Sequence, residues 1–308
     1  MADPGMLSAA IDIGSNTTRV LVAEAYEGQL RKVMEQRAYT RIGKESRREG
    51  GVTGAKVREV AGLVTTQVRL AEVLGAEHIR IVATAAIRTA SNRDDIAAKI
   101  GKAAGLPVDV LSEEEEGRLA FLGATKALGY PVDDEVAVVD VGGGSCEVIL
   151  GTPAGVREVR SFDIGSGSLA DDYLAEDPPS AAEIRAIRDQ VADVFEGVEL
   201  DHPEQAVAVG GSATSLRRLV GAVLEYETLE RGIRVLAGSQ IDEVARQFEL
   251  DPRRVRILPT GVLLLEKFSQ LLGSPLQIGK GGLREGVILT LLNGNGVDSD
   301  HASQPLAA

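Results

Sequence analysis

The stretch Val136–Thr152 reads V-A-V-V-D-V-G-G-G-S-C-E-V-I-L-G-T and places one aspartate and three glycines between two apolar runs. The stretch Ser8–Glu24 has the same plan and reads S-A-A-I-D-I-G-S-N-T-T-R-V-L-V-A-E. Each apolar run has the length and composition of a buried β-strand. Asp12 aligns with Asp140 at an offset of 128 residues, and the residues around both keep that offset. The repeat therefore predicts two related β-turn-β units.

The pattern that follows each unit predicts further strands and then helices. In the first half, strands are expected at 7–13, 19–25, 30–39, 78–84 and 107–111, and helices at 53–74, 92–104 and 113–128. In the second half, strands are expected at 136–140, 146–151, 156–162 and 206–209, and helices at 166–174, 181–196, 212–220, 239–248, 259–272 and 283–292. This order predicts an α/β fold of two duplicated lobes, each a mixed β-sheet flanked by helices, with a cleft between them.

The lobes are expected at residues 1–128 and 129–292, and the charge distribution supports a boundary there. Residues 1–128 hold 18 Lys/Arg and 17 Asp/Glu, whereas the remainder holds 15 and 29, so most of the net charge of −13 belongs to the second half. The last helix, 283–292, is expected to cross back onto the first lobe. Residues 293–308 have the composition of a disordered tail.

The composition also limits the classes of function. Aromatic residues make up 3% of the chain and Trp is absent, which argues against a protein that stacks nucleic-acid bases. The single cysteine, Cys146, excludes an internal disulfide framework, and its surroundings predict a buried filler. No basic leader or long apolar run predicts a signal peptide or membrane span, so a cytoplasmic protein without a membrane partner is expected.

The glycine-rich turns predict a site for phosphate groups. Glycines let backbone N–H groups converge, and successive N–H groups form a concavity that binds anions. A third glycine-rich turn, V-G-G-S-A-T at 209–214, opens a helix, where anions also bind. Ordinary tight hairpins are the alternative for either turn alone, but two facing turns would hold a phosphate chain from both sides. The turn residues assigned to phosphate binding are Gly14, Ser15, Asn16, Thr17, Gly142, Gly143, Gly144, Ser145, Gly210, Gly211 and Ser212.

The two aspartates of the turns, Asp12 and Asp140, repel phosphate and would act on it through a cation. Mg²⁺ is the ion expected, because it bridges carboxylates and phosphate oxygens. Asp12 is accordingly grouped with the phosphate-binding turn, and Asp140 with the metal site. Arg88 ends a buried strand that points towards the cleft, and its guanidinium is expected to bind phosphate oxygens. A surface arginine is the alternative.

The run E-E-E-E at 113–116 contains one residue that a helix start does not explain. Ser112 and Glu115 form a capping-box pattern, and glutamates in a first turn complement the helix dipole. Glu116 instead continues a stripe of small residues, Ala120, Gly123 and Ala127, and is expected to face the cleft. Partial burial raises the pKa of a carboxyl group, which suits Glu116 to accept a proton from water.

A basic segment at 41–48 extends the positive charge of the first half. A solvated loop is the favoured interpretation, and a track for a long anion is the alternative. The segment and one further arginine contribute Arg41, Lys44, Arg47, Arg48 and Arg93.

The turns, taken together, resemble the exopolyphosphatase/guanosine pentaphosphate phosphohydrolase (Ppx/GppA) family. The matching pieces are D-I-G-S-N-T-T-R, A-T-A-A-I-R, S-E-E-E-E-G-R, D-V-G-G-G-S-C-E, G-S-G-S, V-G-G-S-A-T and G-G-L-R-E-G, in the family's order. The resemblance implies two ribonuclease H-like lobes of the actin, sugar kinase and heat-shock chaperone ATPase superfamily, in the short two-lobe form. The active site would lie in the cleft between the lobes.

The resemblance also implies residue roles and ligands. Glu116 matches the family's proposed general base, and Glu147 matches a second active-site glutamate that binds metal or positions water. Arg19 falls at a position where the family varies. The substrate implied is inorganic polyphosphate, together with guanosine pentaphosphate (pppGpp), and Mg²⁺ would assist, with Mn²⁺ or K⁺ as alternatives. A homodimer is a further expectation from the family.

Two other functions fit the same turns. An ATP-dependent kinase or ATPase of the superfamily would bind phosphates alike but exclude water and transfer phosphate to an acceptor. A non-catalytic sensor would bind polyphosphate or the alarmone nucleotide without releasing phosphate. The carboxylates at Glu116 and Glu147 argue against the sensor.

Overall fold

The structure, a computed structural model, describes residues 5–128 and 134–294. A tail was expected at 293–308. Residues 293 and 294 belong to the last helix, and residues 295–308 lie outside the described residues. In chain order the elements are β1 (Leu7–Ile13), β2 (Thr17–Tyr26), β3 (Gln29–Tyr39), α1 (Ile42–Glu49), α2 (Gly54–Val73), β4 (His78–Ala83), α3 (Ala85–Arg88), α4 (Arg93–Ala104), β5 (Val108–Val110), α5 (Glu113–Lys126), β6 (Val136–Val141), β7 (Cys146–Thr152), β8 (Gly155–Phe162), α6 (Ser166–Tyr173), α7 (Ala181–Val194), β9 (Gln205–Val209), α8 (Gly210–Val220), β10 (Val223–Leu224), α9 (Tyr226–Gly238), α10 (Ile241–Phe248), α11 (Pro252–Val255), α12 (Leu258–Leu272), β11 (Leu276–Ile278) and α13 (Leu283–Gly294).

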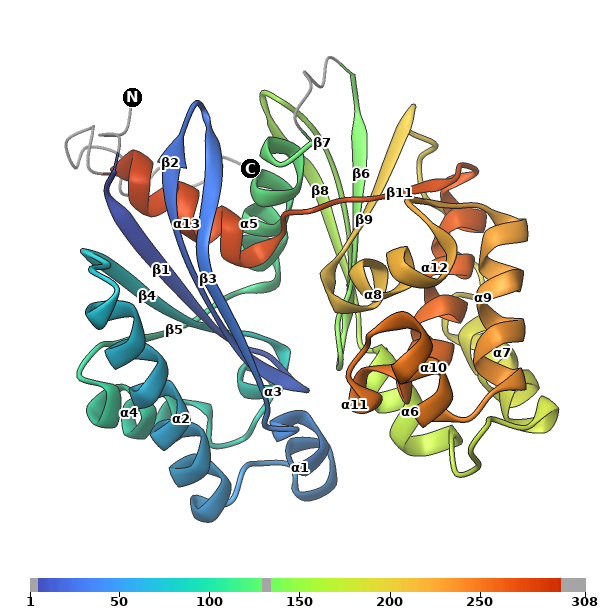
Figure 1. Cartoon of the computed structure of the whole chain (residues 1–308), viewed down its shortest axis with the longest axis horizontal. Helices are drawn as coiled ribbons and strands as arrows, with labels where there is room; N and C mark the ends of the chain where they lie inside the picture. Colours follow the sequence, from blue (N-terminus) through green and yellow to red (C-terminus); the bar gives the residue numbers. More distant parts are fainter. Residues whose placement is uncertain (1–4, 129–133, 295–308) are drawn as a thin grey trace.

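Two mixed sheets form the two lobes, as the repeat predicted (Figure 1). The first sheet has the order β3-β2-β1-β4-β5, and the second has the order β10-β11-β9-β6-β7-β8. In each, the first three strands are antiparallel and the next strand is parallel to the first. Asp12 faces Arg19 across the first hairpin, and Asp140 faces Glu147 across the second. The same register at both places confirms the predicted duplication.

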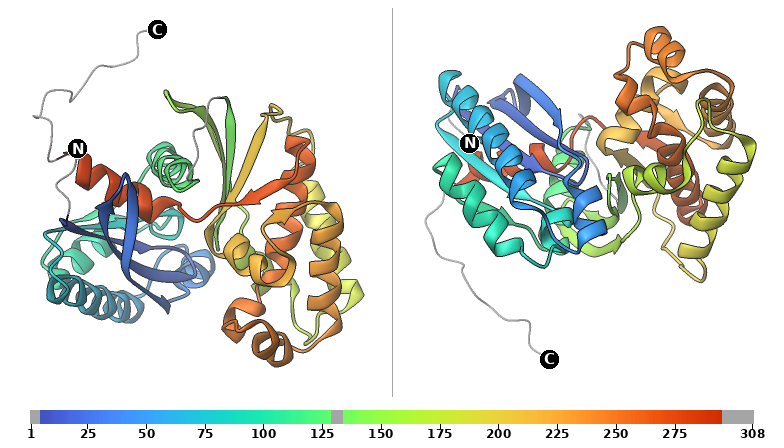
Figure 2. Two further views of the ribbon diagram at one scale, coloured as in Figure 1. Left: turned by 45° about the horizontal axis from the view of Figure 1, so that its top comes forward. Right: turned by 90° about the horizontal axis from the view of Figure 1, so that it is seen from below.

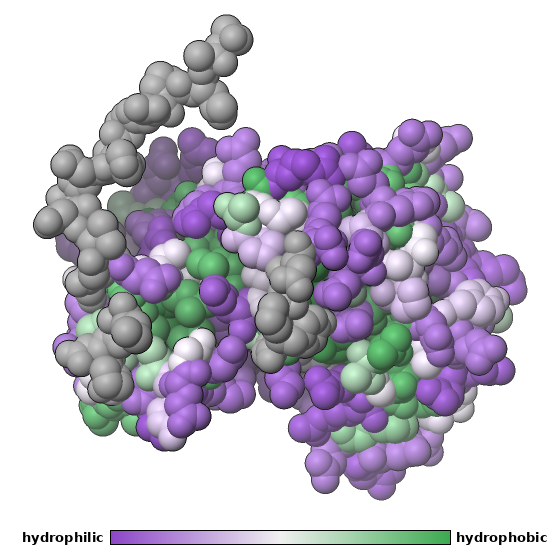
Figure 3. All heavy atoms as spheres, turned by 90° about the horizontal axis from the view of Figure 1, so that it is seen from above, coloured by the Kyte–Doolittle hydropathy of each residue, from purple (hydrophilic) through white to green (hydrophobic). Residues whose placement is uncertain are grey.

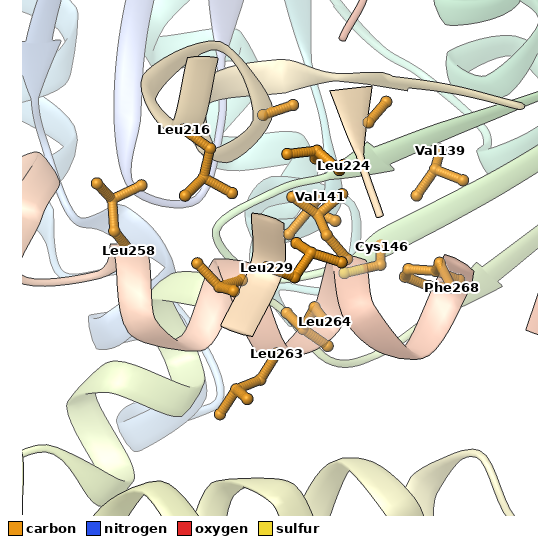
Figure 4. Close-up of a cluster of buried hydrophobic side chains, with 14 of the residues drawn as sticks. Val139, Val141, Cys146, Leu216, Leu224, Leu229, Leu258, Leu263, Leu264 and Phe268 are labelled. Atoms are coloured by element: carbon orange, nitrogen blue, oxygen red, sulfur yellow. The ribbon is translucent and has the colours of Figure 1, made fainter. Parts of the chain in front are cut away.

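Helices cover both faces of each sheet. In the first lobe, α2 and α4 pack on one face, and α2 buries the apolar positions that its sequence spacing predicted. In the second lobe, α6 to α9 and α12 enclose the largest core, part of which Figure 4 shows, from Leu258 to Phe268 of α12. Cys146 belongs to this core and is fully buried, which confirms its role as a filler.

The helices α5 and α13 lie side by side between the sheets, and each covers the sheet of the other half of the chain (Figure 2). Phe121 and Ala124 of α5 pack on the second sheet. Val287 and Ile288 of α13 pack on the first. The two helices approach so closely that a Cβ on Gly286 would overlap the carbonyl oxygen of Leu119. This contact fixes the first turn of α5 relative to both lobes.

The basic segment at 41–48 forms helix α1, so the interpretation as a solvated loop is wrong. Ile42 and Gly43 are buried, and the Gly43 N–H donates to the carbonyl oxygen of Ser15 at 2.8 Å. The sequence did not reveal the helix because its eight residues contain one apolar side chain and are held by tertiary contacts with the first glycine-rich turn, α3 and α6. The expected strands and long helices are otherwise present, and α9 adds a helix that was not expected.

Within residues 5–128 and 134–294, no helix is both long enough and apolar enough to cross a membrane. On the face shown in Figure 3, hydrophilic residues cover most of both lobes, and hydrophobic residues form smaller groups among them.

Candidate active site

A cavity of about 790 Å³ lies between the two lobes. Both glycine-rich turns line it, together with the inner face of α5, the start of α8 and the segment that leads into α13. Its wall contains eight cationic side chains and six acidic ones, an excess of positive charge in a chain whose net charge is −13. These cations are Arg19, Lys32, Arg37, Lys126, Arg217, Arg254, Lys280 and Arg284. The cavity is therefore suited to a ligand with several negative charges.

The two turns have matching geometry and touch each other. The Gly14 N–H donates to the Thr17 carbonyl at 3.1 Å, and the Gly142 N–H donates to the Ser145 carbonyl at 3.0 Å. A Cβ on Gly143 would lie 2.8 Å from the Cβ of Asn16, so the glycine permits the two turns to meet. Every turn residue assigned to phosphate binding between 14 and 17 and between 142 and 145 lines the cavity.

The third glycine-rich turn contributes backbone but not its serine. Gly210 has a φ of +83°, and a Cβ there would collide with Oδ1 of Asp140. Gly210 and Gly211 line the cavity at the N-terminus of α8, whose dipole attracts anions. Ser212 is fully buried and hydrogen-bonds to Ser166 at 3.4 Å. The structure therefore places the Ser212 side chain beneath the turn and outside the cavity wall.

Glu116 lies in the cavity wall and is paired with Arg88. The Nη1 of Arg88 donates to Oε2 of Glu116 at 2.6 Å, and the same atom donates to the Leu111 carbonyl at 3.2 Å. Burial raises the pKa of Glu116 to about 7, opposed by Arg88 and reinforced by the charges of Asp12 and Asp140. Arg88 is not among the lining residues. It was expected to bind phosphate, and in the structure its guanidinium group pairs with Glu116.

Glu147 is held by two serine hydroxyl groups. Ser145 donates to its Oε1 at 2.6 Å, and Ser161 donates to the same oxygen at 3.3 Å. Burial raises its pKa well above the usual value, and the charges of Glu116 and Asp140 add to the effect. Because both hydroxyls engage Oε1, Oε2 is the oxygen left for a ligand in the cavity.

The carboxylates of the site suit a cation that is shared with the substrate. Burial raises the pKa of Asp140 to about 6, and Asp12 reinforces this. The Oδ1 of Asp12 is buried without a hydrogen-bond partner. Among the described residues, no group of three or more ligand side chains is close enough to hold a metal by itself. Mg²⁺ commonly binds one or two carboxylates together with substrate phosphates, so Asp140 and Glu147 fit such an ion.

Five arginines in the cavity wall were not assigned a role from the sequence, and three of them have contacts or charges that act on the turns. A Cβ on Gly211 would lie 2.6 Å from Nη2 of Arg19 and 2.7 Å from Nη2 of Arg254, so both guanidinium groups lie over the N-terminus of α8. Arg284 donates to Glu35 at 2.8 Å and acts electrostatically on Asp12 and Asp140.

One feature of the sequence could have identified Arg19 as a residue of the cleft: it aligns with Glu147 at the offset of 128 residues. Strand register then directs both side chains towards the same cleft. Burial and the charges of neighbouring arginines lower the pKa of Arg19 to about 9. Burial and the charge of Arg37 lower the pKa of Arg254 to about 10. Such crowding of like charges costs free energy unless an anion joins them. These arginines are consequently candidates to bind phosphate.

Two residues of the basic segment, Lys44 and Arg47, contact the second lobe, and none of the segment lines the cavity. Lys44 and Arg47 of α1 both reach Asp171 of α6, at 3.3 and 3.7 Å. Arg253 of α11 lies 4.1 Å from the centre of the Tyr39 ring on β3. These contacts join the two lobes through elements other than α5 and α13.

Comparisons with known proteins agree with this architecture. The model of the Ppx/GppA phosphatase family matches residues 21–294. Exopolyphosphatase 1 of Mycobacterium leprae is 27% identical over 306 residues, which cover 94% of this chain and 90% of the relative. Exopolyphosphatase 2 of Mycobacterium tuberculosis is 27% identical over 92% of this chain and 98% of the relative.

Solved structures extend the likeness to three dimensions. The crystal structure of the Aquifex aeolicus member of the Ppx/GppA family has a TM-score of 0.79 at 27% identity, over 95% of this chain and 99% of that one. An exopolyphosphatase from Cytophaga hutchinsonii has a TM-score of 0.81 at 20% identity, over 94% and 98% of the two chains, and shares the fold.

Proposed function

The chain belongs to the Ppx/GppA phosphatase family, and we propose that it is an exopolyphosphatase that removes the terminal orthophosphate from inorganic polyphosphate. The observation that carries the proposal is the position of Glu116. Its carboxylate lies in the wall of a cationic cavity, beside two opposed phosphate turns, with a pKa of about 7. A base with a pKa near neutrality is suited to take a proton from water. The similarity to curated exopolyphosphatases supports the same substrate.

The backbone and the arginines would bind the chain end. The Gly14 and Gly142 N–H groups are bonded within their own turns, so the N–H groups of Gly143 and Gly144 would bind the terminal phosphoryl group, and Arg19 and Arg254 would neutralise its neighbours. Asp140 and Glu147 would hold Mg²⁺ against the phosphate oxygens. When bound, the ion offsets charge that develops on those oxygens in the transition state.

Glu116 would orient and deprotonate the attacking water. Arg88 occupies Oε2, so Oε1 is the oxygen free to accept the proton. The water oxygen forms a new bond to the terminal phosphorus while the anhydride bond to the next phosphoryl group breaks, and the shortened chain leaves with the bridging oxygen. Positioning and electrostatics supply most of the catalysis in reactions of this type.

Time-resolved release of orthophosphate tests the proposal. The substrates are polyphosphates of several lengths and pppGpp, each with and without Mg²⁺, and a parallel reaction supplies ATP with candidate acceptors. Release from polyphosphate that depends on Mg²⁺ is expected, and release from pppGpp would add a second substrate of the same site. Transfer to an acceptor without release into water would instead identify a kinase. Tight binding without any release would identify a sensor.

A further inference from the structure

The cavity extends well beyond the residues that surround the reacting phosphate. Helix α5 contributes Glu116 near its start and Lys126, Ala127 and Leu128 at its end. Ten residues of helix separate Glu116 from Lys126, which corresponds to about 15 Å at 1.5 Å per residue. A single orthophosphate or a short chain held at Glu116 would leave the far end of the cavity unfilled.

A second segment brings another lysine to that far end. The connection from β11 to α13 passes beside α5 (Figure 1), and a Cβ on Gly281 would lie 2.8 Å from the Cβ of Ala127. Lys280, which precedes Gly281, lines the same cavity as Lys126. Residues from two distant parts of the sequence therefore place two ammonium groups at one end of the cavity.

No carboxylate neutralises these two lysines. Lys32 and Arg284 also line the cavity, but both pair with Glu35, at 3.0 and 2.8 Å. Within residues 5–128 and 134–294, neither Lys126 nor Lys280 forms an ion pair or a side-chain hydrogen bond, although acidic residues outnumber basic ones in the chain. The C-terminal end of α5 carries partial negative charge, so attraction of an anion to this end must come from the lysines.

We propose that Lys126 and Lys280 form a distal subsite that binds phosphoryl groups several units along the chain from the one that is cleaved. This inference rests on the proposed function and adds the means by which the protein distinguishes long chains from short ones. A chain that spans the distance from Glu116 gains both contacts, and a chain too short to span it gains neither. The subsite therefore lowers KM for long substrates without affecting the chemical step.

The test compares long-chain polyphosphate with tripolyphosphate in Lys126→Ala, Lys280→Ala and the double variant. Lys102→Ala is the matched control, because Lys102 is also exposed and without an ion pair but lies away from the cavity. In the double variant, KM for the long chain is expected to rise at least about tenfold, in line with the loss of two phosphate contacts. The kcat for both substrates and the KM for tripolyphosphate should stay within about twofold of the unchanged protein.

The salt dependence gives a second readout. Each lost lysine–phosphate contact should reduce the slope of log KM against log salt by about one for the long chain only. An equal rise in KM for both substrates, or no rise for either, would contradict the distal subsite while leaving the proposed function intact. Failure of the unchanged protein to release phosphate from either substrate would contradict the proposed function itself.

Discussion

At the scale of single residues, Glu116 and Arg88 form the pair that sets the pH range of the site. Burial raises the pKa of Glu116 to about 7, while the Arg88 hydrogen bond and charge lower it. The base works only when it is deprotonated. A plot of log kcat/KM for polyphosphate against pH is therefore expected to rise with a slope of about one and level off near pH 7.

Replacing Arg88 checks this interpretation. In Arg88→Gln the carboxylate loses its cationic partner, so its pKa rises and the limb of the profile should move to higher pH. In Arg88→Lys the charge remains and the shift should be smaller. A profile that did not move in Arg88→Gln would show that a group other than Glu116 controls the limb.

The residues that sequence could identify are those fixed by local structure. Asp12, Asp140 and the turn glycines were predictable because a repeated hairpin determines where they lie. The roles of Arg254 and Ser212 were not, because they depend on how α8 and α11 pack around the second turn. Nothing in the short run D-P-R-R-V-R distinguishes Arg254, which is buried, from its exposed neighbour Arg253.

At the scale of elements, the contact between α5 and α13 positions Glu116. In Gly286→Ala the new methyl group would overlap the Leu119 carbonyl oxygen, and backbone cannot yield as a flexible side chain can. The free energy of unfolding is expected to fall by at least about 2 kcal/mol, measured by chemical denaturation. The kcat should also fall, since α5 must shift.

The matched control is Gly62→Ala on the exposed face of α2, where a Cβ meets nothing within 4 Å. It should gain about 0.5–1 kcal/mol from the better helix propensity of alanine. Equal effects of the two substitutions would contradict the close helix contact.

Sequence patterns predicted the long elements of the fold but only part of how they cover the sheets. Periodicity placed α2 correctly because it buries a regular apolar face, whereas α12, also present where a helix was expected, is buried on all sides over residues 258–266. The return of the last helix, α13, to the first lobe was expected and is confirmed. The packing of α5 on the second sheet was not expected, because either sheet would accept an apolar helix face. Short elements such as α1 were missed because tertiary contacts, not local propensity, stabilise them.

At the scale of the whole molecule, Asp171 of α6 joins the two lobes through its ion pairs with Lys44 and Arg47 of α1. These ion pairs are partly exposed, and each is worth about 0–1 kcal/mol. In Asp171→Asn the packing of the two lobes against each other loses this contribution. The KM for polyphosphate, which binds between the lobes, is therefore expected to rise by up to about fivefold with little change in kcat.

The neighbouring variant Asp172→Asn removes the same charge from α6 without removing an ion pair, because Asp172 forms none within the described ranges. Its KM should match that of the unchanged protein. The difference between the two variants should also shrink at high salt, which screens exposed pairs. Identical KM values for both variants at low salt would show that the contacts of Asp171 between the lobes do not affect substrate binding.

Orthophosphate release by Glu116→Gln tests most directly that a carboxylate between two phosphate turns activates water. Release from polyphosphate should fall at least about 100-fold, and direct titration should show polyphosphate binding within a few-fold of the unchanged protein, because the amide keeps the shape of the side chain but not its basicity. Turnover in Glu116→Gln close to that of the unchanged protein would contradict the account.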